Sequence, residues 1–110
     1  MINFSKRPII AVIYLRPLLG YPQHPGINQV IDLALEDLSV LRKCGIDAAL
    51  LENEHDTPYT VKASKEVISS MSVVAHCVQR EAGSYNIGSE FLINDPEASL
   101  AIAKAAGNSF

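Results

Sequence analysis

Hydrophobic residues follow two different patterns along this chain, and the two patterns alternate. Nearly continuous hydrophobic runs cover residues 8–15 and 48–52, the second of which ends in the polar residue Glu52, and a less regular run covers residues 87–93. Continuous hydrophobic character is typical of parallel strands that are buried on both faces. Between these runs, hydrophobic residues recur every three or four positions, which is the period of a helix with one buried face. We therefore predict three strands, each followed by a helix.

The helical periods predict helices over residues 27–44 and 64–80, and a third helix that starts at residue 96. Each is followed within a few residues by a glycine, which readily adopts the left-handed conformation that ends many helices. Asp95 is suited to the N-cap of the third helix, and Pro96 to its first position.

A strand followed by a helix, repeated about every forty residues, predicts a parallel sheet with right-handed crossover connections. Two folds fit this order: an open sheet with helices on both faces, and a closed barrel. Pro17 and Pro22 stand where a dinucleotide-binding sheet has its glycine-rich phosphate loop, which favours the barrel. We predict strands adjacent in the order 1-2-3, with helices on one side of the sheet only.

A complete (β/α)8 barrel needs about 250 residues, whereas this chain has 110. The predicted fold class is therefore α/β: a partial (β/α)8 TIM barrel of the aldolase type, with its first three and a half βα units. We predict that residues 1–110 are the N-terminal portion of one barrel domain, truncated before closure, with Ser109 and Phe110 starting a fourth strand. The uncovered inner face is expected to cause self-association, or binding of a complementing C-terminal barrel half.

The net charge of −3 is mild and evenly spread, without a basic patch suited to a phosphate backbone, which argues against a nucleic-acid partner. No long hydrophobic segment follows the first positive charges, and the run at residues 8–15 is too short to span a bilayer. We predict a cytoplasmic protein without a transmembrane segment, and leave peripheral membrane association open. Cys44 and Cys77 lie on the hydrophobic side of the helical patterns, and we predict both as buried, reduced thiols.

Specific motifs occur where each predicted strand ends. They are VIYLRPLLGYP after the first strand, LLEN and DTPY around the end of the second, and LINDPEASLAIAKAAGNSF from the end of the third. In this order, and in register from Pro8 to Phe110, the motifs make the chain resemble the BtpA family, also called BtpA/SgcQ. The resemblance implies a barrel with its site at the C-terminal mouth of the strands, in a longer protein that continues past Phe110.

The resemblance also bears on function. Members are linked to biogenesis or stabilisation of photosystem I in cyanobacteria, while some relatives are encoded beside sugar-transport genes and have no securely assigned reaction. This chain departs from the family pattern at five positions: Tyr14 replaces His, Leu19 replaces Pro, His55 replaces Gly, Glu90 replaces Asn and Ile93 replaces Arg. A phenol with a pKa near 10 is a poor substitute for an imidazole in proton transfer near neutral pH. These departures argue against inherited catalysis.

Seven polar residues lie at or just past the predicted strand ends, where a barrel places its chemistry. We predict catalytic roles for Glu52, Asp56 and Asn94. We predict substrate contacts for Tyr14, Arg16, Asn53 and Asp95.

Structural alternatives stand beside these roles. Asp95 is fully explained by helix capping, Asp56 by bracing of the Thr-Pro turn that follows it, and Arg16 by simple surface exposure. Glu90 is expected to face the barrel interior together with Leu92 and Asn94. There it needs a partner such as Lys or Arg from the missing half, unless the third strand is poorly formed.

The three histidines show no metal-ligand spacing, and we predict no metal site; no cofactor is identified. Three functional interpretations remain open. The parent barrel acts on or binds a small polar metabolite, such as a sugar or nucleoside derivative; it is a non-enzymatic accessory factor in biogenesis of photosystem I or another membrane complex; or this chain is an inactive truncated product. Enzymatic activity is left undecided among them.

Overall fold

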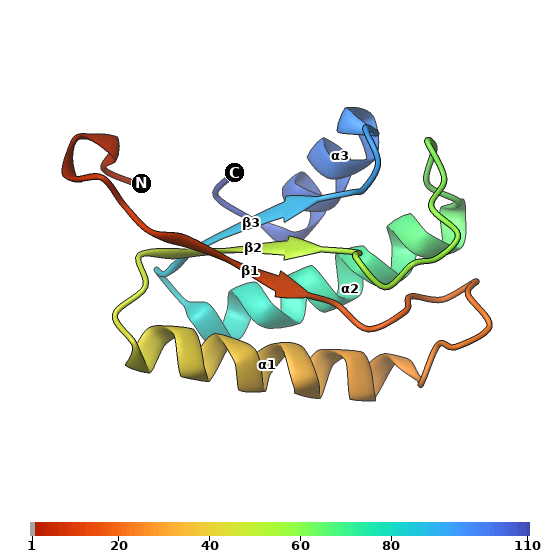
Figure 1. Cartoon of the computed structure of the whole chain (residues 1–110), viewed down its shortest axis with the longest axis horizontal. Helices are drawn as coiled ribbons and strands as arrows, with labels where there is room; N and C mark the ends of the chain where they lie inside the picture. Colours follow the sequence, from red (N-terminus) through yellow and green to blue (C-terminus); the bar gives the residue numbers. More distant parts are fainter. Residues whose placement is uncertain (1) are drawn as a thin grey trace.

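A parallel three-stranded sheet, described here from a computed structural model of residues 2–110, forms the centre of the molecule (Figure 1). The strands are β1 (Ile10–Tyr14), β2 (Ala48–Glu52) and β3 (Asn86–Glu90). A short 3-10 turn, η1 (Phe4–Lys6), precedes them, and the helices α1 (Ile27–Lys43), α2 (Lys65–Ala82) and α3 (Pro96–Ala106) follow one strand each. The strands are adjacent in the order β1-β2-β3, as predicted.

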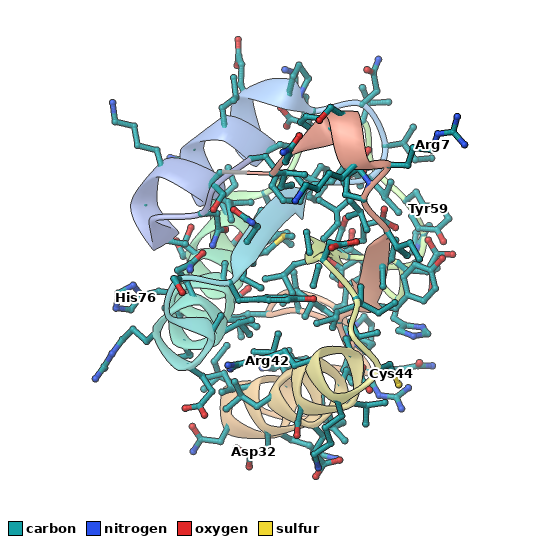
Figure 2. The ribbon with its side chains drawn as sticks, turned by 90° about the vertical axis from the view of Figure 1, so that its left-hand side faces the viewer. Arg7, Asp32, Arg42, Cys44, Tyr59 and His76 are labelled. Atoms are coloured by element: carbon teal, nitrogen blue, oxygen red, sulfur yellow. The ribbon has the colours of Figure 1, made fainter. Side chains whose placement is uncertain are left out.

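The three helices cover one face of this sheet. Viewed along the strands, they form an arc along one side of the sheet (Figure 2). The residues that face them, such as Ile13, Leu51 and Ile87, are at most 1% exposed, whereas Val12 on the other face is 38% exposed. One-sided packing separates a barrel segment from a doubly wound sheet. The predicted α/β class and the arrangement of partial-barrel units are therefore confirmed.

The two strand pairings fix which side chains share a face. Tyr14 pairs with Glu52, and Glu52 pairs with Glu90, so the last residues of the three strands lie in one row. Because successive side chains alternate across a strand, this row lies on the face without helices. The residues one position along the strands point toward the helices and pack with them in a hydrophobic core.

Side chains near the helix ends explain where the helices begin. The Ser64 hydroxyl accepts a hydrogen bond from the Val67 N–H (3.3 Å) and caps α2. The Asp95 carboxylate accepts one from the Ala98 N–H (3.1 Å) and caps α3, with Pro96 as its first residue. Both features predicted for the start of α3 are confirmed. Gly107, with a φ of 77°, ends this helix in the left-handed conformation.

The predicted end of the third strand was wrong, because β3 stops at Glu90 and not at residue 93. Beyond Glu90 the next two backbone N–H groups donate hydrogen bonds to side chains and not to a neighbouring strand. The Phe91 N–H donates to the Ser99 hydroxyl (2.9 Å), and the Leu92 N–H donates to the Asn53 side chain (2.7 Å). Asn94 follows in a turn with a φ of 64°, so it does not share the strand period of Glu90.

Burial of the two cysteines was also predicted wrongly. Cys44 is exposed and Cys77 is only half-buried. The buried residues of α1 recur every four positions, at Val30, Ala34 and Leu38, and Cys44 lies six positions past the last of them, off the buried face and at the exposed end of the helix (Figure 2).

The last two residues lie beside β3. The Ser109 N–H donates to the Ile87 carbonyl (2.7 Å), and the Ser89 N–H donates to the Phe110 carbonyl (3.1 Å). An ideal Cβ built on Gly88 would overlap the Phe110 ring, so this ring covers the glycine on the open face of the sheet. These contacts agree with the start of a fourth strand at Ser109 and Phe110.

Candidate functional site

The strongest candidate for a site is the row of polar residues at the ends of the strands. Tyr14, Glu52 and Glu90 end β1, β2 and β3, pair in register, and project from the face that lacks helices. Tyr14 is 52% exposed, Glu90 is exposed, and Glu52 between them is half-buried. A molecule bound at this edge therefore meets a phenol and two carboxylates on three adjacent strands.

The electrostatics of the row centre on Glu52. Partial burial raises the pKa of the Glu52 carboxyl above its usual value, and the negative charges of Glu90 and Glu54 raise it further. Within residues 2–110, neither Glu52 nor Glu90 has a basic side chain at ion-pair distance. The two carboxyl groups can accept hydrogen bonds from hydroxyl and amino groups of a ligand.

Asn94 reaches the same region from the turn after β3. It lines an open hollow of about 500 Å3 together with Glu90, Leu50 and Phe110. The hollow lies against the open face of the sheet and extends to the start of α3. The structure therefore brings Tyr14, Glu52 and Asn94 to the same end of the sheet, as predicted, and adds Glu90 to them.

Asn53 and Asp56 lie at this end too, but they are buried between loops. The Asp56 carboxylate accepts hydrogen bonds from the Leu18 N–H (2.8 Å) and from the Asn53 amide (3.2 Å). The Asn53 side chain also accepts from the Leu92 N–H (2.7 Å) and donates to the Leu92 carbonyl (3.3 Å). These two side chains, which we call the loop brace, join the loops that follow β1, β2 and β3.

The pKa values of the two buried aspartates near the site, Asp56 and Asp95, are shifted in opposite directions. Burial raises the pKa of the Asp56 carboxyl, and the hydrogen bonds from Leu18 and Asn53 only partly oppose this effect. Hydrogen bonds from the Ala63 and Ala98 N–H groups lower the pKa of Asp95. Asp95 therefore stays ionised at neutral pH, with its oxygens engaged by backbone groups (Ala63 N–H at 2.9 Å) and by the Lys62 ammonium at 3.6 Å.

Direct ligand contacts by Asn53, Asp56 and Asp95 stay predictions, and the observed partners of these three side chains are other parts of the chain. Arg16 is exposed just past the end of β1. Its predicted role in ligand binding is likewise untested.

Two features of the site were missing from the predicted residues. The sequence predicts Glu90 as an interior carboxylate in need of a partner, whereas the structure shows that it ends β3 just as Glu52 ends β2. The second feature is the Tyr59 hydroxyl, which donates to the Glu54 carbonyl (2.9 Å) and carboxylate (3.1 Å) within the loop after β2. No motif pointed to this pair.

Across residues 2–110, no group of three or more His, Cys, Asp or Glu side chains is placed to hold a metal ion. No helix within the described range combines the length and the hydrophobicity needed to cross a membrane. His76 lies exposed on α2 and points away from the sheet (Figure 2).

A family model described as the BtpA family matches residues 5–110, nearly the whole chain. The chain belongs to the BtpA family. The resemblance inferred from the strand-end motifs is thereby confirmed. No solved structure matches the chain.

Curated relatives of this BtpA-family chain come from archaea and bacteria. An uncharacterized protein of Archaeoglobus fulgidus is 39% identical over 105 residues, which are 96% of this chain and 42% of that protein. The putative sgc region protein SgcQ of Escherichia coli is 33% identical, with 96% and 40% covered. The photosystem I biogenesis protein BtpA of a Synechocystis strain is 30% identical, with 96% and 37% covered. The chain thus spans about two fifths of the length of these relatives.

Proposed function

We propose that this chain forms part of a β/α barrel that binds a small polar metabolite, such as a sugar or a nucleoside derivative, at the C-terminal ends of its strands. The observation that carries the proposal is the register of Glu52 with Glu90 on adjacent strands, at the edge where such folds place their ligands. Two carboxylates in a row accept hydrogen bonds from the hydroxyl groups of a sugar. Tyr14, beside Glu52, adds an aromatic ring to this site, and Asn94, beside Glu90, adds an amide group.

Within this proposal the polar residues divide into two groups. Tyr14, Glu52, Glu90 and Asn94 face the open side and contact the ligand. The loop brace of Asn53 and Asp56, together with Asp95, fixes the loops that follow the three strands, including the turn that carries Asn94, because these side chains hydrogen-bond to backbone groups of all three loops.

Glu52 is the residue best suited to proton transfer. Its raised pKa brings it closer to neutral pH than an isolated carboxyl group, which is the usual property of a general acid or base. If the parent barrel is an enzyme, Glu52 is the group that we expect to exchange a proton with the substrate.

The thermal unfolding midpoint of the purified chain tests the binding proposal. We expect glucose, ribose, ribose 5-phosphate, adenosine or uridine at millimolar concentration to raise it. The double variant Glu52→Gln with Asn94→Ala should lose the increase, while Glu36→Gln on the exposed side of α1 should keep it. An increase that survives in the double variant, or no increase with any of these compounds, would contradict the proposal.

A second candidate function follows from one relative. The Synechocystis protein that is 30% identical to this chain is named for photosystem I biogenesis, which favours an accessory role in assembly of a membrane complex. A Synechocystis strain without that protein provides the test. Restored photosystem I content on expression of this chain would support the accessory role, and unchanged content would contradict it.

A further inference from the structure

A row of exposed side chains runs along the outer side of α2. Val73, near the middle of this helix, is 50% exposed, and His76 points away from the sheet (Figure 2). Residues spaced alternately three and four positions apart share one side of a helix, and two helices pack along their length through this spacing. Five exposed residues of α2 follow it, and we call them the α2 stripe: Glu66, Ser69, Val73, His76 and Arg80.

The charged residues of α2 make this helix complementary to an antiparallel copy of itself. Glu66 and Arg80 lie seven positions before and after Val73, and Lys65 and Glu81 lie eight positions before and after it. When a two-fold axis at Val73 relates two antiparallel helices, residues at equal distances from the axis lie opposite each other. Glu66 of each copy then lies against Arg80 of the other. Lys65 lies against Glu81 in the same way, so that every pair joins opposite charges.

These four charged side chains are available for such pairs. All four are exposed, and within residues 2–110 none of them forms an ion pair with another side chain. A parallel copy in register would place each charge against an identical charge, which is unfavourable. Exposed ion pairs add little affinity, but they suppress the wrong orientation. Charge therefore favours a second copy of this chain, in the antiparallel direction, as the occupant of the α2 stripe.

A hydrophobic groove beside the stripe gives the second copy a surface to pack on. Its volume is about 400 Å3, and its lining includes Leu19 and Ile27 together with Ser69 and Val73 of α2. Leu19 is 48% exposed, although it is a large hydrophobic residue. His76 of the second copy lies three positions past the axis, so it reaches the part of the groove just before Val73. Covering Leu19, Ile27 and Val73 removes non-polar surface from water, which favours association.

We propose that this chain forms a two-fold dimer by antiparallel packing of its α2 helices, centred on Val73. The charged pairs at both ends of the helices set the direction and the register, and the groove of each copy accepts His76 of the other. Because α2 runs in opposite directions in the two copies, their strand ends open on opposite sides of the dimer. The interface lies on the outer side of the helices, so the inference is independent of the ligand proposal and of the open face of the sheet.

Sedimentation equilibrium of the purified chain, at concentrations up to millimolar, tests the dimer. We expect reversible dimerisation of the natural chain. Val73→Asp should weaken it at least about tenfold, because it places two like charges together at the axis. Val40→Asp is the matched control: Val40 is 57% exposed on α1, and its substitution should leave dimerisation unchanged. A natural chain that stays monomeric would overturn the proposal and leave the α2 stripe to a different protein.

Charge reversal tests the direction and the register of the two helices. Arg80→Glu and Glu66→Arg each place like charges at both ends of the helix pair, so each variant alone should dimerise at least about tenfold more weakly. An equimolar mixture of the two variants again joins opposite charges at both ends, and we expect a heterodimer with nearly the natural affinity. Recovery in the mixture cannot come from a folding defect of either variant. A mixture that stays monomeric, or a dimer that Val12→Asp dissociates and Val73→Asp does not, would overturn the proposal.

Discussion

Leu50 and Leu51 are neighbours in β2, yet they lie in two different environments. Leu51 faces the helices and is fully buried, while Leu50 faces the open side and is only half-buried. The same contrast separates Ile13 from Val12 in β1. Neighbouring residues of the same chemical type therefore differ in solvent exposure because the helices of this chain cover only one face of the sheet. An unbroken hydrophobic strand indicates that both faces are meant for burial, and the three helices supply the cover for one.

Polar residues follow the same division. Asn53, on the helix side, has hydrogen bonds to Asp56 and to both backbone groups of Leu92. Glu52, one position earlier and on the open side, has the like-charged Glu90 beside it. Among the described residues, every buried side-chain nitrogen and oxygen atom has a hydrogen-bond partner, whereas Glu52 on the open side lies beside a second negative charge. The contrast between the covered side and the open side leads to four predictions, ordered from the largest expected effect to the smallest.

Truncating one leucine on each face should separate the two environments most clearly. We expect Leu51→Ala to lower the free energy of unfolding by about 2–5 kcal/mol, since it leaves a cavity in the closed core. Leu50→Ala should cost about 1 kcal/mol or less, because its side chain is already partly in water. Urea unfolding of the monomer measures both. Equal losses would mean that the open face is covered in solution.

Removing the loop brace should have the next largest effect. In Asp56→Asn, an amide N–H2 group meets the donors of Leu18 or Asn53, and a buried donor left without an acceptor costs about 1–3 kcal/mol. Asp37→Asn, on the exposed side of α1, is the control. Faster hydrogen exchange at the Leu18 N–H should accompany the loss of stability. A stable variant with unchanged exchange would show that the carboxylate is dispensable.

The sequence predicted the covered side of this molecule better than the open side. Periodic hydrophobic residues, a capping Asp95 and the order of the strands were enough to place the elements, because these signals are local. The end of β3 was missed because its cause is tertiary: Asn53, 39 residues away, takes both backbone groups of Leu92. The prediction for Cys44 was wrong because this residue lies six positions past Leu38, the last buried residue of α1, and therefore outside the buried stripe of the helix.

The site shows the same limit. Tyr14, Glu52 and Asn94 were placed at the correct end of the sheet from strand-end motifs alone. Asn53 and Asp56 differ from these three residues because their side chains are buried and hydrogen-bond to neighbouring loops. The spacing of residues along the sequence does not predict such contacts between loops. The pairing of strand ends places Glu90 beside Glu52. The sequence did not predict this pairing, because the predicted third strand continued to residue 93 and Glu90 was not recognised as its last residue.

A third, smaller effect should come from pH. The folded-state pKa of Glu52 is raised, so its contribution to stability is fully present below the unfolded-state pKa and is lost as pH rises through the folded-state value. Glu52→Gln removes this loss. We expect the variant to be more stable than the natural chain at pH 7 by less than about 1 kcal/mol, because partial solvent exposure screens the repulsion. The two proteins should converge as pH falls below about 4.

Urea unfolding between pH 3 and pH 8 measures this difference, with Glu36→Gln on α1 as the control. The comparison with the natural chain cancels the contribution of Asp56, whose pKa is raised as well. A natural chain that is more stable than Glu52→Gln at pH 7 would show that a cation or a basic partner already sits on the glutamates.

The smallest expected effect probes the start of a fourth strand. A methyl group at Gly88 overlaps the Phe110 ring, so Gly88→Ala should push this ring off the open face and break the hydrogen bond from the Ser89 N–H to the Phe110 carbonyl. We expect faster hydrogen exchange at Ser89 and a change in stability of only a few tenths of a kcal/mol, since alanine is also the better strand residue. In a Phe110→Ala background the overlap is gone, and Gly88→Ala should become neutral or slightly stabilising. If Gly88→Ala left Ser89 exchange unchanged, Phe110 would not be anchored beside β3, and the open face would lack its first step toward closure.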